Sequence, residues 1–306
     1  MNAPATFPAD DATFRAQHVG ASEVAALFDA SPWLTHFELW HRKNGTVATP
    51  EFNTGDSERI EWGVRLEPVI LQAAYERWGY VPLDEDHRLS NGAGLGGHPD
   101  RIVTCPNRGR GILEVKTADW LVFKKWGDEP PLHYLLQNMS YQGLAGCVWG
   151  DQIVLVGGNQ LHRFQYDFRP KVYADIERRV TAFWQSVRAN DPPKPDFRRD
   201  GDTLAAVLGE PDDTLADLRG DNHADDLACN WTEAKARLKE AEAEVEEAKN
   251  ALLLKIGAAS AALLPNHRIS CGQTKGSAGT LITADHVGTT IGARKGYRRF
   301  DVKETA

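Results

Sequence analysis

The sequence predicts an α/β (α+β) fold in which a central sheet is flanked by helices, followed by a C-terminal extension of a long helix and short strands. Three observations lead to this prediction. Apolar residues recur at helical spacing in several segments, short apolar runs bounded by Gly or Pro lie between those segments, and a heptad-like pattern follows a proline-rich break. A chain order of helix, strands, helix and strands is typical of layered domains.

Helices are expected from the N-terminal part onward. Residues 21–28 are predicted to form a short helix with Ser22 as its N-cap, because a serine hydroxyl accepts hydrogen bonds from the free amides of a first turn. After a break at residues 31–33, a second helix is expected with Thr35 as its cap and an end near Gly45. Longer apolar patterns predict further helices over residues 57–78, 132–145 and 172–188.

Short strands are expected between these helices. Residues 95–103 and 111–116 are apolar runs with Gly or Pro at their boundaries, and they predict two neighbouring strands of a meander. Residues 152–156 and 162–166 predict a second pair of strands. Together these strands would form the sheet against which the apolar faces of the helices pack.

The composition of the chain changes near residue 190. Three prolines within residues 191–196 cannot continue a helix, because proline lacks an amide proton. An acidic stretch follows them. We therefore predict a main domain over residues 1–190, a proline-rich and acidic linker over residues 191–228, and an extension over residues 229–306.

One long helix is expected in the extension. Apolar residues there repeat with alternating spacings of three and four, at Trp231, Ala234, Leu238, Ala241, Val245, Ala248 and Leu252. The helix either supports the main domain or offers a docking surface to a partner, and self-association through so few heptads would be weak. Beyond it, residues 267–300 are expected to form short strands.

Composition excludes several classes of protein. The 306 residues are 42% hydrophobic and 25% charged, as in soluble globular proteins, and the apolar runs are too short to span a bilayer. No secretory signal is visible, so a cytoplasmic location is expected. The 4 cysteines form no CxxC pair, which argues against a structural zinc or iron–sulfur site. The net charge of −8 reflects acidic stretches beyond residue 209, and it leaves room for a local basic groove.

The main candidate site consists of Asp100, Glu114 and Lys116. Side chains two positions apart in a strand point to the same face, so Glu114 and Lys116 should lie together while Val115 packs into the core. If the strand after Asp100 pairs with the strand that carries Glu114, the two carboxylates come side by side. Two carboxylates and one ammonium group would then share a small patch.

Such a patch suits hydrolysis of a phosphodiester bond. Mg²⁺ prefers hard oxygen ligands, which Asp100, Glu114 and the backbone carbonyl of Val115 would supply. The ion lowers the pKa of a water molecule and stabilises negative charge on the reacting phosphate, and a second ion would assist departure of the leaving oxygen. Lys116 would orient the attacking water or stabilise developing charge. Mn²⁺ is the alternative ion.

Two further polar residues lie on the flanking helices. Glu67 belongs to the helix that precedes the strands, and a carboxylate that faces a sheet there is explained by a nearby metal ion. Gln137 belongs to the helix that follows Lys116, from which its amide could reach the attacking water or the phosphate. Both are therefore added to the candidate catalytic residues.

Successive segments of the chain resemble the motifs of the YqaJ-type viral recombinases, the family of phage lambda exonuclease within the PD-(D/E)xK nuclease superfamily. In chain order they read GASEVAALF, SPWLTHFELWHRKNG, EWGVRLEPVI, GGHPDRI, ILEVKTA and HYLLQNMSYQ, from about residue 15 to residue 158. The resemblance implies a restriction-endonuclease-like core with a mixed central sheet. It also implies a processive exonuclease, encoded by a phage or prophage of a bacterial host, that digests one strand of linear double-stranded DNA from its 5′ end.

The same resemblance implies partners and site residues. It predicts a homo-oligomer, with a trimeric ring as the family's form, and cooperation with a phage single-strand annealing protein. By position, Asp100 and Glu114 match the family's metal ligands, and Glu67, Lys116 and Gln137 match its remaining motif residues. Arg15 and Ser22 match the positions where the family binds a terminal 5′-phosphate. A guanidinium group suits phosphate, and a serine at a helix N-terminus adds further donors. The alternative for Arg15 is an ordinary surface arginine.

The chain departs from the family in two places. Arg101 follows Asp100 where many relatives carry glycine, and the region beyond residue 191 has no counterpart in lambda exonuclease, so the trimer does not transfer directly. Two other functions stay open at this point. One is a structure-specific or restriction-like endonuclease, and the other is a non-catalytic protein that binds DNA ends.

Overall fold

The computed structural model describes residues 9–49, 58–85, 87–210, 214–274 and 301–304. The chain forms two units, residues 1–212 and residues 213–306, and each is described here by itself. Within the described residues, no helix combines the length and the hydropathy that crossing a membrane requires.

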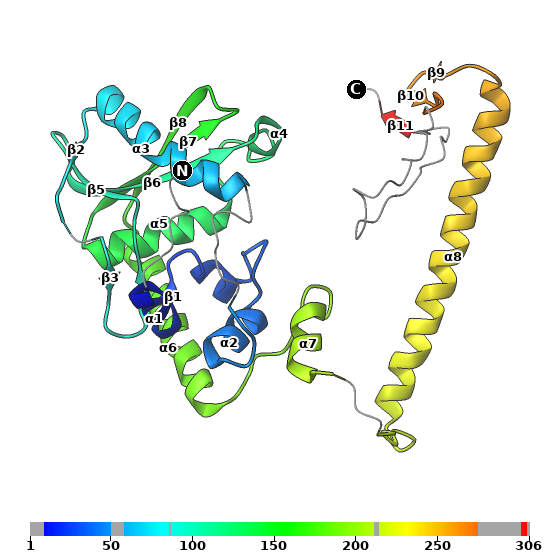
Figure 1. The fold of residues 1–306 in the computed structure, drawn as a ribbon, viewed down its shortest axis with the longest axis horizontal. Coiled ribbons are helices and arrows are strands. Elements are labelled where there is room, and N and C mark those ends of the chain that lie inside the picture. Colours follow the sequence, from blue (N-terminus) through cyan, green and yellow to red (C-terminus); the bar gives the residue numbers. More distant parts are fainter. Residues whose placement is uncertain (1–8, 50–57, 86, 211–213, 275–300, 305–306) are drawn as a thin grey trace, which may run out of the picture. The chain divides into compact units, whose positions relative to one another are not determined.

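The first unit contains helices around a central sheet (Figure 1). Its helices are α1 (Ala9–Gln17), the 3-10 helix η1 (Val24–Phe28), α2 (His36–Asn44), α3 (Glu58–Trp78), α4 (Trp120–Phe123), α5 (Leu132–Ala145), α6 (Pro170–Ala189) and α7 (Gly201–Leu208). Its strands are β1 (Val19–Gly20), β2 (Val81–Pro82), β3 (Leu89–Ser90), β4 (Leu95–Gly97), β5 (Arg101–Cys105), β6 (Gly109–Ala118), β7 (Trp149–Val156) and β8 (Gln160–Asp167).

The central sheet has the strand order β2-β5-β6-β7-β8. Strand β6 is antiparallel to β5 and parallel to β7, and β8 returns antiparallel to β7, so the sheet is mixed. A parallel pair needs a crossover connection, and the segment that contains α4 and α5 provides it between β6 and β7. The predicted fold class, a mixed central sheet flanked by helices, is confirmed.

Helices α3 and α5 cover opposite faces of this sheet (Figure 1). Strand β6 alternates between the two faces: Leu113 and Val115 pack in one cluster with residues of α3, whereas Ile112 packs with Tyr141 of α5. A further cluster joins α5 to α6, α2 and η1. The edge of β6 beyond its pairing with β5 therefore lies between α3 and α5, where the candidate site residues are found.

Several helices form as the sequence predicts. Helix α5 has the predicted bounds. Helix α2 begins after its predicted cap Thr35, whose side-chain oxygen accepts a hydrogen bond from the Glu38 amide. It ends at Gly45, which adopts the left-handed conformation. Helix α3 covers the described part of the predicted segment, since Ser57 lies outside the described residues. Helix α1 was not predicted, because its residues show no strong apolar pattern.

The prediction for residues 21–28 is wrong in two respects. The segment is a short 3-10 helix from Val24 to Phe28, and Glu23 occupies its N-cap position, so Ser22 does not cap it. The backbone before Val24 is engaged elsewhere: β1 pairs in parallel with β4, and the Ala21 amide donates to the Gly96 carbonyl at 2.9 Å. These hydrogen bonds hold residues 19–21 extended, and too few residues are left for an α-helix.

The predicted strand over residues 95–103 is divided into two. Its first part, β4, belongs to a small sheet with the order β1-β4-β3, and its second part, β5, belongs to the central sheet. His98, Pro99 and Asp100 separate them, and Pro99 cannot donate a hydrogen bond within a ladder. The division frees Asp100 from strand pairing at the start of β5.

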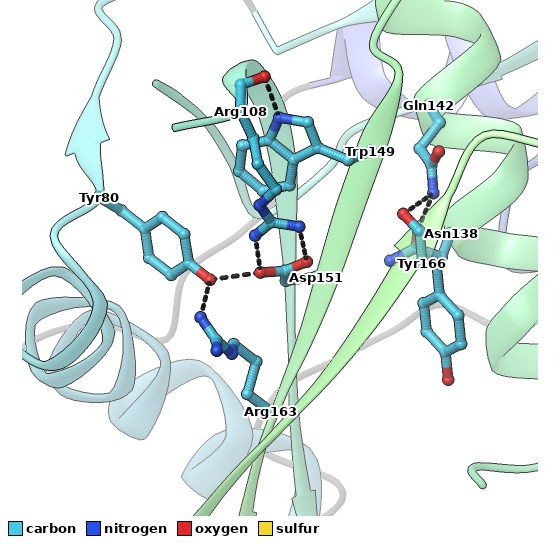
Figure 2. Close-up of polar contacts among 8 residues, drawn as sticks. All are labelled: Tyr80, Arg108, Asn138, Gln142, Trp149, Asp151, Arg163 and Tyr166. Atoms are coloured by element: carbon cyan, nitrogen blue, oxygen red, sulfur yellow. Dashed lines mark hydrogen bonds and ion pairs between the residues drawn. The ribbon is translucent and has the colours of Figure 1, made fainter. Parts of the chain in front are cut away.

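A buried polar network crosses the α3-side face of the sheet (Figure 2). Asp151 of β7 is fully buried, forms a two-bond ion pair with Arg108 and accepts a hydrogen bond from the Tyr80 hydroxyl. The Arg108 guanidinium lies 3.9 Å from the ring centre of Trp149, whose indole nitrogen donates to the Arg108 carbonyl at 2.8 Å. Arg163 donates to the Tyr80 hydroxyl at 3.3 Å. These contacts satisfy the buried carboxylate.

The second unit contains α8 (Asn222–Ile256), β9 (Ala261–Leu263), β10 (His267–Ser270) and β11 (Asp301–Glu304). Asp221 caps α8 by accepting hydrogen bonds from the His223 and Ala224 amides. The helix begins before the heptad pattern and includes all of it. Strands β9, β10 and β11 form one antiparallel sheet, and the predicted strands that fall on residues 275–300 lie outside the described residues.

Candidate active site

The pairing of β5 with β6 brings Asp100 beside Glu114. Arg101 stands opposite Leu113 in the antiparallel register, so the next residues outward are Asp100 and Glu114. The Val115 amide donates to Asp100 Oδ2 at 2.6 Å. The N–H and C=O groups of one strand residue point toward the same neighbouring strand, so the Val115 carbonyl also faces the side of Asp100.

Glu114 is the most enclosed side chain of this group, with 2% of its surface exposed. Its Oε1 accepts a hydrogen bond from Lys116 Nζ at 2.5 Å and another from Gln137 Nε2 at 2.7 Å. Its Oε2 is buried and has no hydrogen-bond partner among the described residues. A buried carboxyl oxygen without a hydrogen-bond partner calls for a proton or a cation at that oxygen.

Burial raises the pKa of all three carboxyl groups of this site. Burial raises the pKa of Glu67 to about 7, and the charge of Asp100 adds to the effect. Burial also raises the pKa of Glu114, with further contributions from Asp100 and Glu67. Burial raises the pKa of Asp100, although Lys116 and the Val115 amide oppose this shift. The three groups repel when ionised, and a divalent cation would relieve that repulsion.

Lys116 supplies the positive charge of the cluster. Burial alone would lower the pKa of Lys116, but the charges of Glu114 and Asp100 outweigh burial and raise it, so the side chain stays protonated. Its Nζ lies 5.7 Å from the ring centre of Tyr134 on α5, a distance typical of a cation–π contact. The ammonium group of Lys116 is thus positioned by Glu114 of the same strand and by Tyr134 of α5.

The donor set fits a hard divalent ion. The carboxylates of Asp100 and Glu114 and the carbonyl of Val115 are the oxygen ligands that Mg²⁺ or Mn²⁺ prefers, and Glu114 Oε2 is free to bind. Within the described residues, no group of three or more His, Cys, Asp or Glu side chains is arranged to hold a metal by itself. Glu67 interacts with this cluster through charge, from α3.

A cavity of about 970 Å³ opens beside the cluster, within the first unit. Arg15, Ser22, Lys116 and Gln137 all line it. Arg15 comes from α1, and Ser22, which is exposed, comes from the turn between β1 and η1. The structure therefore brings the two predicted phosphate-binding residues to the same cavity as the predicted lysine and glutamine.

Two tyrosines that the sequence did not predict complete the contribution of α5 to the site. Tyr134 contacts Lys116, and the Tyr141 hydroxyl accepts a hydrogen bond from Gln137 Nε2 at 3.5 Å. Both tyrosines line the cavity. Tyr134, Gln137 and Tyr141 are spaced by three and four residues and so lie on one helix face, a signal that was available in the sequence.

Comparison with known proteins gives two kinds of similarity. LHK-Exo, solved in complex with dAMP, superposes with a TM-score of 0.49 and 19% identity over 63% of this chain and 97% of that chain. The alkaline exonuclease LHK-Exo from Laribacter hongkongensis gives 0.48 and 20% over 64% and 100%. A phage related exonuclease from Haemophilus somnus 129PT gives 0.43 and 13% over 56% and 94%.

The second kind of similarity lies in the sequence. None of the curated proteins is detectably similar to the chain. The model of the YqaJ-like viral recombinase domain, in contrast, matches residues 12–148, a range that contains Arg15, Glu67, Asp100, Lys116 and Gln137. This range runs from α1 to the connection before β7 and includes every candidate residue described above. Residues 12–148 are thus similar to the YqaJ-like viral recombinase domain, and the predicted resemblance to this family is confirmed over that range.

Proposed function

We propose that the protein is a Mg²⁺-dependent DNA exonuclease that hydrolyses phosphodiester bonds of linear double-stranded DNA in phage-type recombination. The observation that carries the proposal is the buried cluster of Asp100, Glu114 and Lys116, which opens onto a cavity that Arg15 also lines. The similarity of residues 12–148 to a viral recombinase domain supports it. Mn²⁺ is the alternative ion, and two ions are expected to bind.

The metal would be held by the carboxylates of Asp100 and Glu114 and the carbonyl of Val115. Bound there, Mg²⁺ would supply positive charge against the scissile phosphate and lower the pKa of the attacking water. Lys116, which stays protonated, would donate a hydrogen bond to that water or to a phosphate oxygen. Gln137 holds Glu114 through Oε1, which leaves the buried Oε2 available to the ion.

Glu67 has a distinct part in this proposal. Its pKa of about 7 suits a group that takes up a proton from the attacking water near neutral pH and releases it afterwards. It lies on α3, whereas Lys116 and Gln137 approach from β6 and α5. The groups around the reacting phosphate would therefore come from three elements, α3, β6 and α5.

Arg15 and Ser22 would bind the terminal phosphate of the DNA strand. An arginine fork forms paired hydrogen bonds with phosphate oxygens, and a serine hydroxyl adds one donor. Because both residues line the cavity that Lys116 lines, an end held by its 5′-phosphate would present the next phosphodiester bond to the cluster. Digestion would then run from the 5′ end. We expect the protein to act in a bacterial cytoplasm as a homo-oligomer, which is a trimer in the family, together with a phage single-strand annealing protein.

The test is digestion of linear 5′-phosphorylated duplex DNA in Mg²⁺, with label at either end and with covalently closed circular DNA in parallel. We expect release of nucleotides from the 5′ strand of the linear DNA alone. Lys116→Ala should reduce the rate by about 100- to 1000-fold, the effect of removing a charge-stabilising donor. Lys171→Ala, an exposed residue of α6, is the matched control and should retain the rate.

The other outcomes separate the competing functions. Cleavage of the closed circle would favour an endonuclease and contradict the exonuclease proposal. Binding of ends without cleavage in either Mg²⁺ or Mn²⁺ would favour a non-catalytic end-binding protein. Digestion from the 3′ end would leave the nuclease site intact and contradict the role given to Arg15 and Ser22.

A further inference from the structure

Trp33 is an exposed aromatic side chain in the wall of the active-site cavity. It is 68% exposed, and it lines the same cavity as Arg15 and Lys116. Other exposed tryptophans of the described residues, Trp62, Trp120 and Trp231, do not line this cavity. Leaving a large indole in water is unfavourable, so its place among phosphate-binding and catalytic groups calls for an occupant.

The loop that carries Trp33 is held from several sides. Ser31 is buried, and its hydroxyl accepts hydrogen bonds from the amides of Trp33 at 3.4 Å and Leu34 at 3.1 Å. Arg199 donates to the Ser31 carbonyl at 2.8 Å from a position far along the chain. The His133 ring meets the Trp33 ring nearly at a right angle, with centroids 4.9 Å apart. The indole is therefore positioned before any ligand binds.

We propose that Trp33 stacks on the nucleobase of the terminal nucleotide of the DNA strand that enters the cavity. This inference rests on the proposed function, because the phosphate of that nucleotide would be bound by Arg15 and its next phosphodiester bond would face Lys116. Between two sites that bind charge, a nucleotide has one large apolar surface left, the face of its base. Trp33 is a planar apolar group of matching size in the same cavity.

Stacking makes this contact independent of sequence. Every base has a π face, whereas hydrogen-bond readout would require donors and acceptors arranged for one base. An enzyme that removes successive nucleotides has to accept each base in turn, and an indole ring can stack on any of the four bases. Trp33 would thus add affinity for any nucleotide without reading its identity.

The test is a thermodynamic cycle in which the Trp33 side chain, the terminal base, or both are removed and the affinity for DNA is measured. Duplexes with a 5′-phosphate carry either adenine or an abasic tetrahydrofuran residue at the 5′ terminus, and their affinities are measured by fluorescence anisotropy in Ca²⁺, with the DNA checked to stay intact. In the wild type, loss of the base should weaken binding roughly tenfold. In Trp33→Ala, binding to the adenine duplex should fall roughly tenfold, and removal of the base should have no further effect.

Three variants serve as controls. Trp33→Phe keeps an aromatic face and should retain most of the dependence on the base. Trp33→Leu keeps an apolar side chain without that face, and it replaces Trp33→Ala if the alanine variant does not reach the wild-type unfolding temperature. Trp62→Ala removes an indole of similar exposure outside the cavity, and it should show the wild-type dependence on the base.

The outcomes are distinct from those of the nuclease test. If Trp33→Ala and Trp33→Leu keep the full wild-type dependence on the base, the stacking role is wrong, even where the enzyme cleaves DNA. If Trp62→Ala loses that dependence as strongly, the effect belongs to general duplex binding, and the role of Trp33 is again contradicted. Absence of cleavage in Mg²⁺ would remove the nuclease proposal, while the binding cycle would still report on Trp33.

Discussion

Glu114 is where the opposing charges of the candidate site meet. One of its oxygens accepts hydrogen bonds from both Lys116 and Gln137, and the other is buried without a partner among the described residues. Lys116 holds this carboxylate by charge, but a single lysine does not balance the ionised forms of Glu114, Asp100 and Glu67. Gln137 adds orientation without adding charge. The chemistry of the cluster therefore depends on how Glu114 is held.

Replacement of Gln137 by alanine tests this dependence. Gln137→Ala removes the amide that orients Glu114, and we expect the rate of DNA digestion to fall by about 10- to 100-fold, as for other residues that orient a metal ligand. The concentration of Mg²⁺ for half-maximal activity should rise, which a loss of packing alone would not cause. Gln72→Ala, on the exposed face of α3, should change neither quantity.

Binding of a divalent ion should stabilise the protein without any DNA present. Because the carboxylates repel one another, an ion in hundredfold excess over its dissociation constant should raise the unfolding temperature by roughly 5 to 10 °C. Asp100→Asn should begin with a higher unfolding temperature in EDTA, since one negative charge is removed, and should respond less to Mg²⁺ or Mn²⁺. An equal response in both proteins, measured by calorimetry, would place the ion elsewhere.

Among the elements, β6 organises the site through strand alternation. Leu113 and Val115 pack toward α3, while Ile112 packs toward α5, and Glu114 and Lys116 continue that second face up to the cavity. Near the start of the strand, a Cβ on Gly111 would lie 2.1 Å from the Trp149 ring, so only glycine allows β7 to approach this closely. A change that shifts β6 by one residue would exchange the two faces.

The Asp151 network on β7 is predicted to contribute stability and not catalysis. Asp151 pairs in register with Leu113, on the face toward α3, and its partners Arg108 and Tyr80 satisfy it. Asp151→Ala would leave the Arg108 charge without its partner, and we expect a loss of about 3 to 5 kcal/mol in the free energy of unfolding. Urea denaturation measures this loss. Activity per folded molecule should be retained, and Asp167→Ala, an exposed residue of β8, should be nearly neutral.

The sequence predicts local elements better than long-range contacts. Helix α5 and the cap at Thr35 follow from apolar spacing and turn chemistry, and the hairpin-like approach of Asp100 to Glu114 follows from strand register. The pairing of β1 with β4, which prevents the predicted helix at Ser22, involves residues about 75 apart and leaves no local pattern. Trp33 escaped notice for the same reason, since only the folded chain places it in the cavity.

At the scale of the whole molecule, Asp200 connects the segment just before α7 to the loop before α2 through a hydrogen bond with Thr35. It is 1% exposed, it accepts a hydrogen bond from the Thr35 hydroxyl at 2.5 Å, and it also accepts one from the Asp196 amide at 2.6 Å. Thr35 follows shortly after Trp33, so this contact and the one from Arg199 to Ser31 fix the cavity wall. Residues beyond the predicted boundary at 190 thus complete the first unit.

Asp200→Ala tests this link in the full chain. Loss of the two hydrogen bonds should lower the free energy of unfolding by about 1 to 3 kcal/mol. Affinity for DNA ends should fall as well, because the loop that carries Trp33 loses an anchor. Asp202→Ala, an exposed aspartate in the first turn of α7, is the control. Equal affinities for DNA ends in the two variants would show that the loop does not need this anchor.

The separation of Thr35 from Asp200 along the chain also has a consequence during synthesis. The two residues are 165 positions apart, so a ribosome that adds about 5 to 20 residues per second needs roughly 8 to 33 s between them. The strands β5 to β8 are all complete before Asp200 is made. A nascent chain therefore completes the strands that carry Asp100 and Glu114 before it makes Asp200, the residue that anchors the loop in the cavity wall.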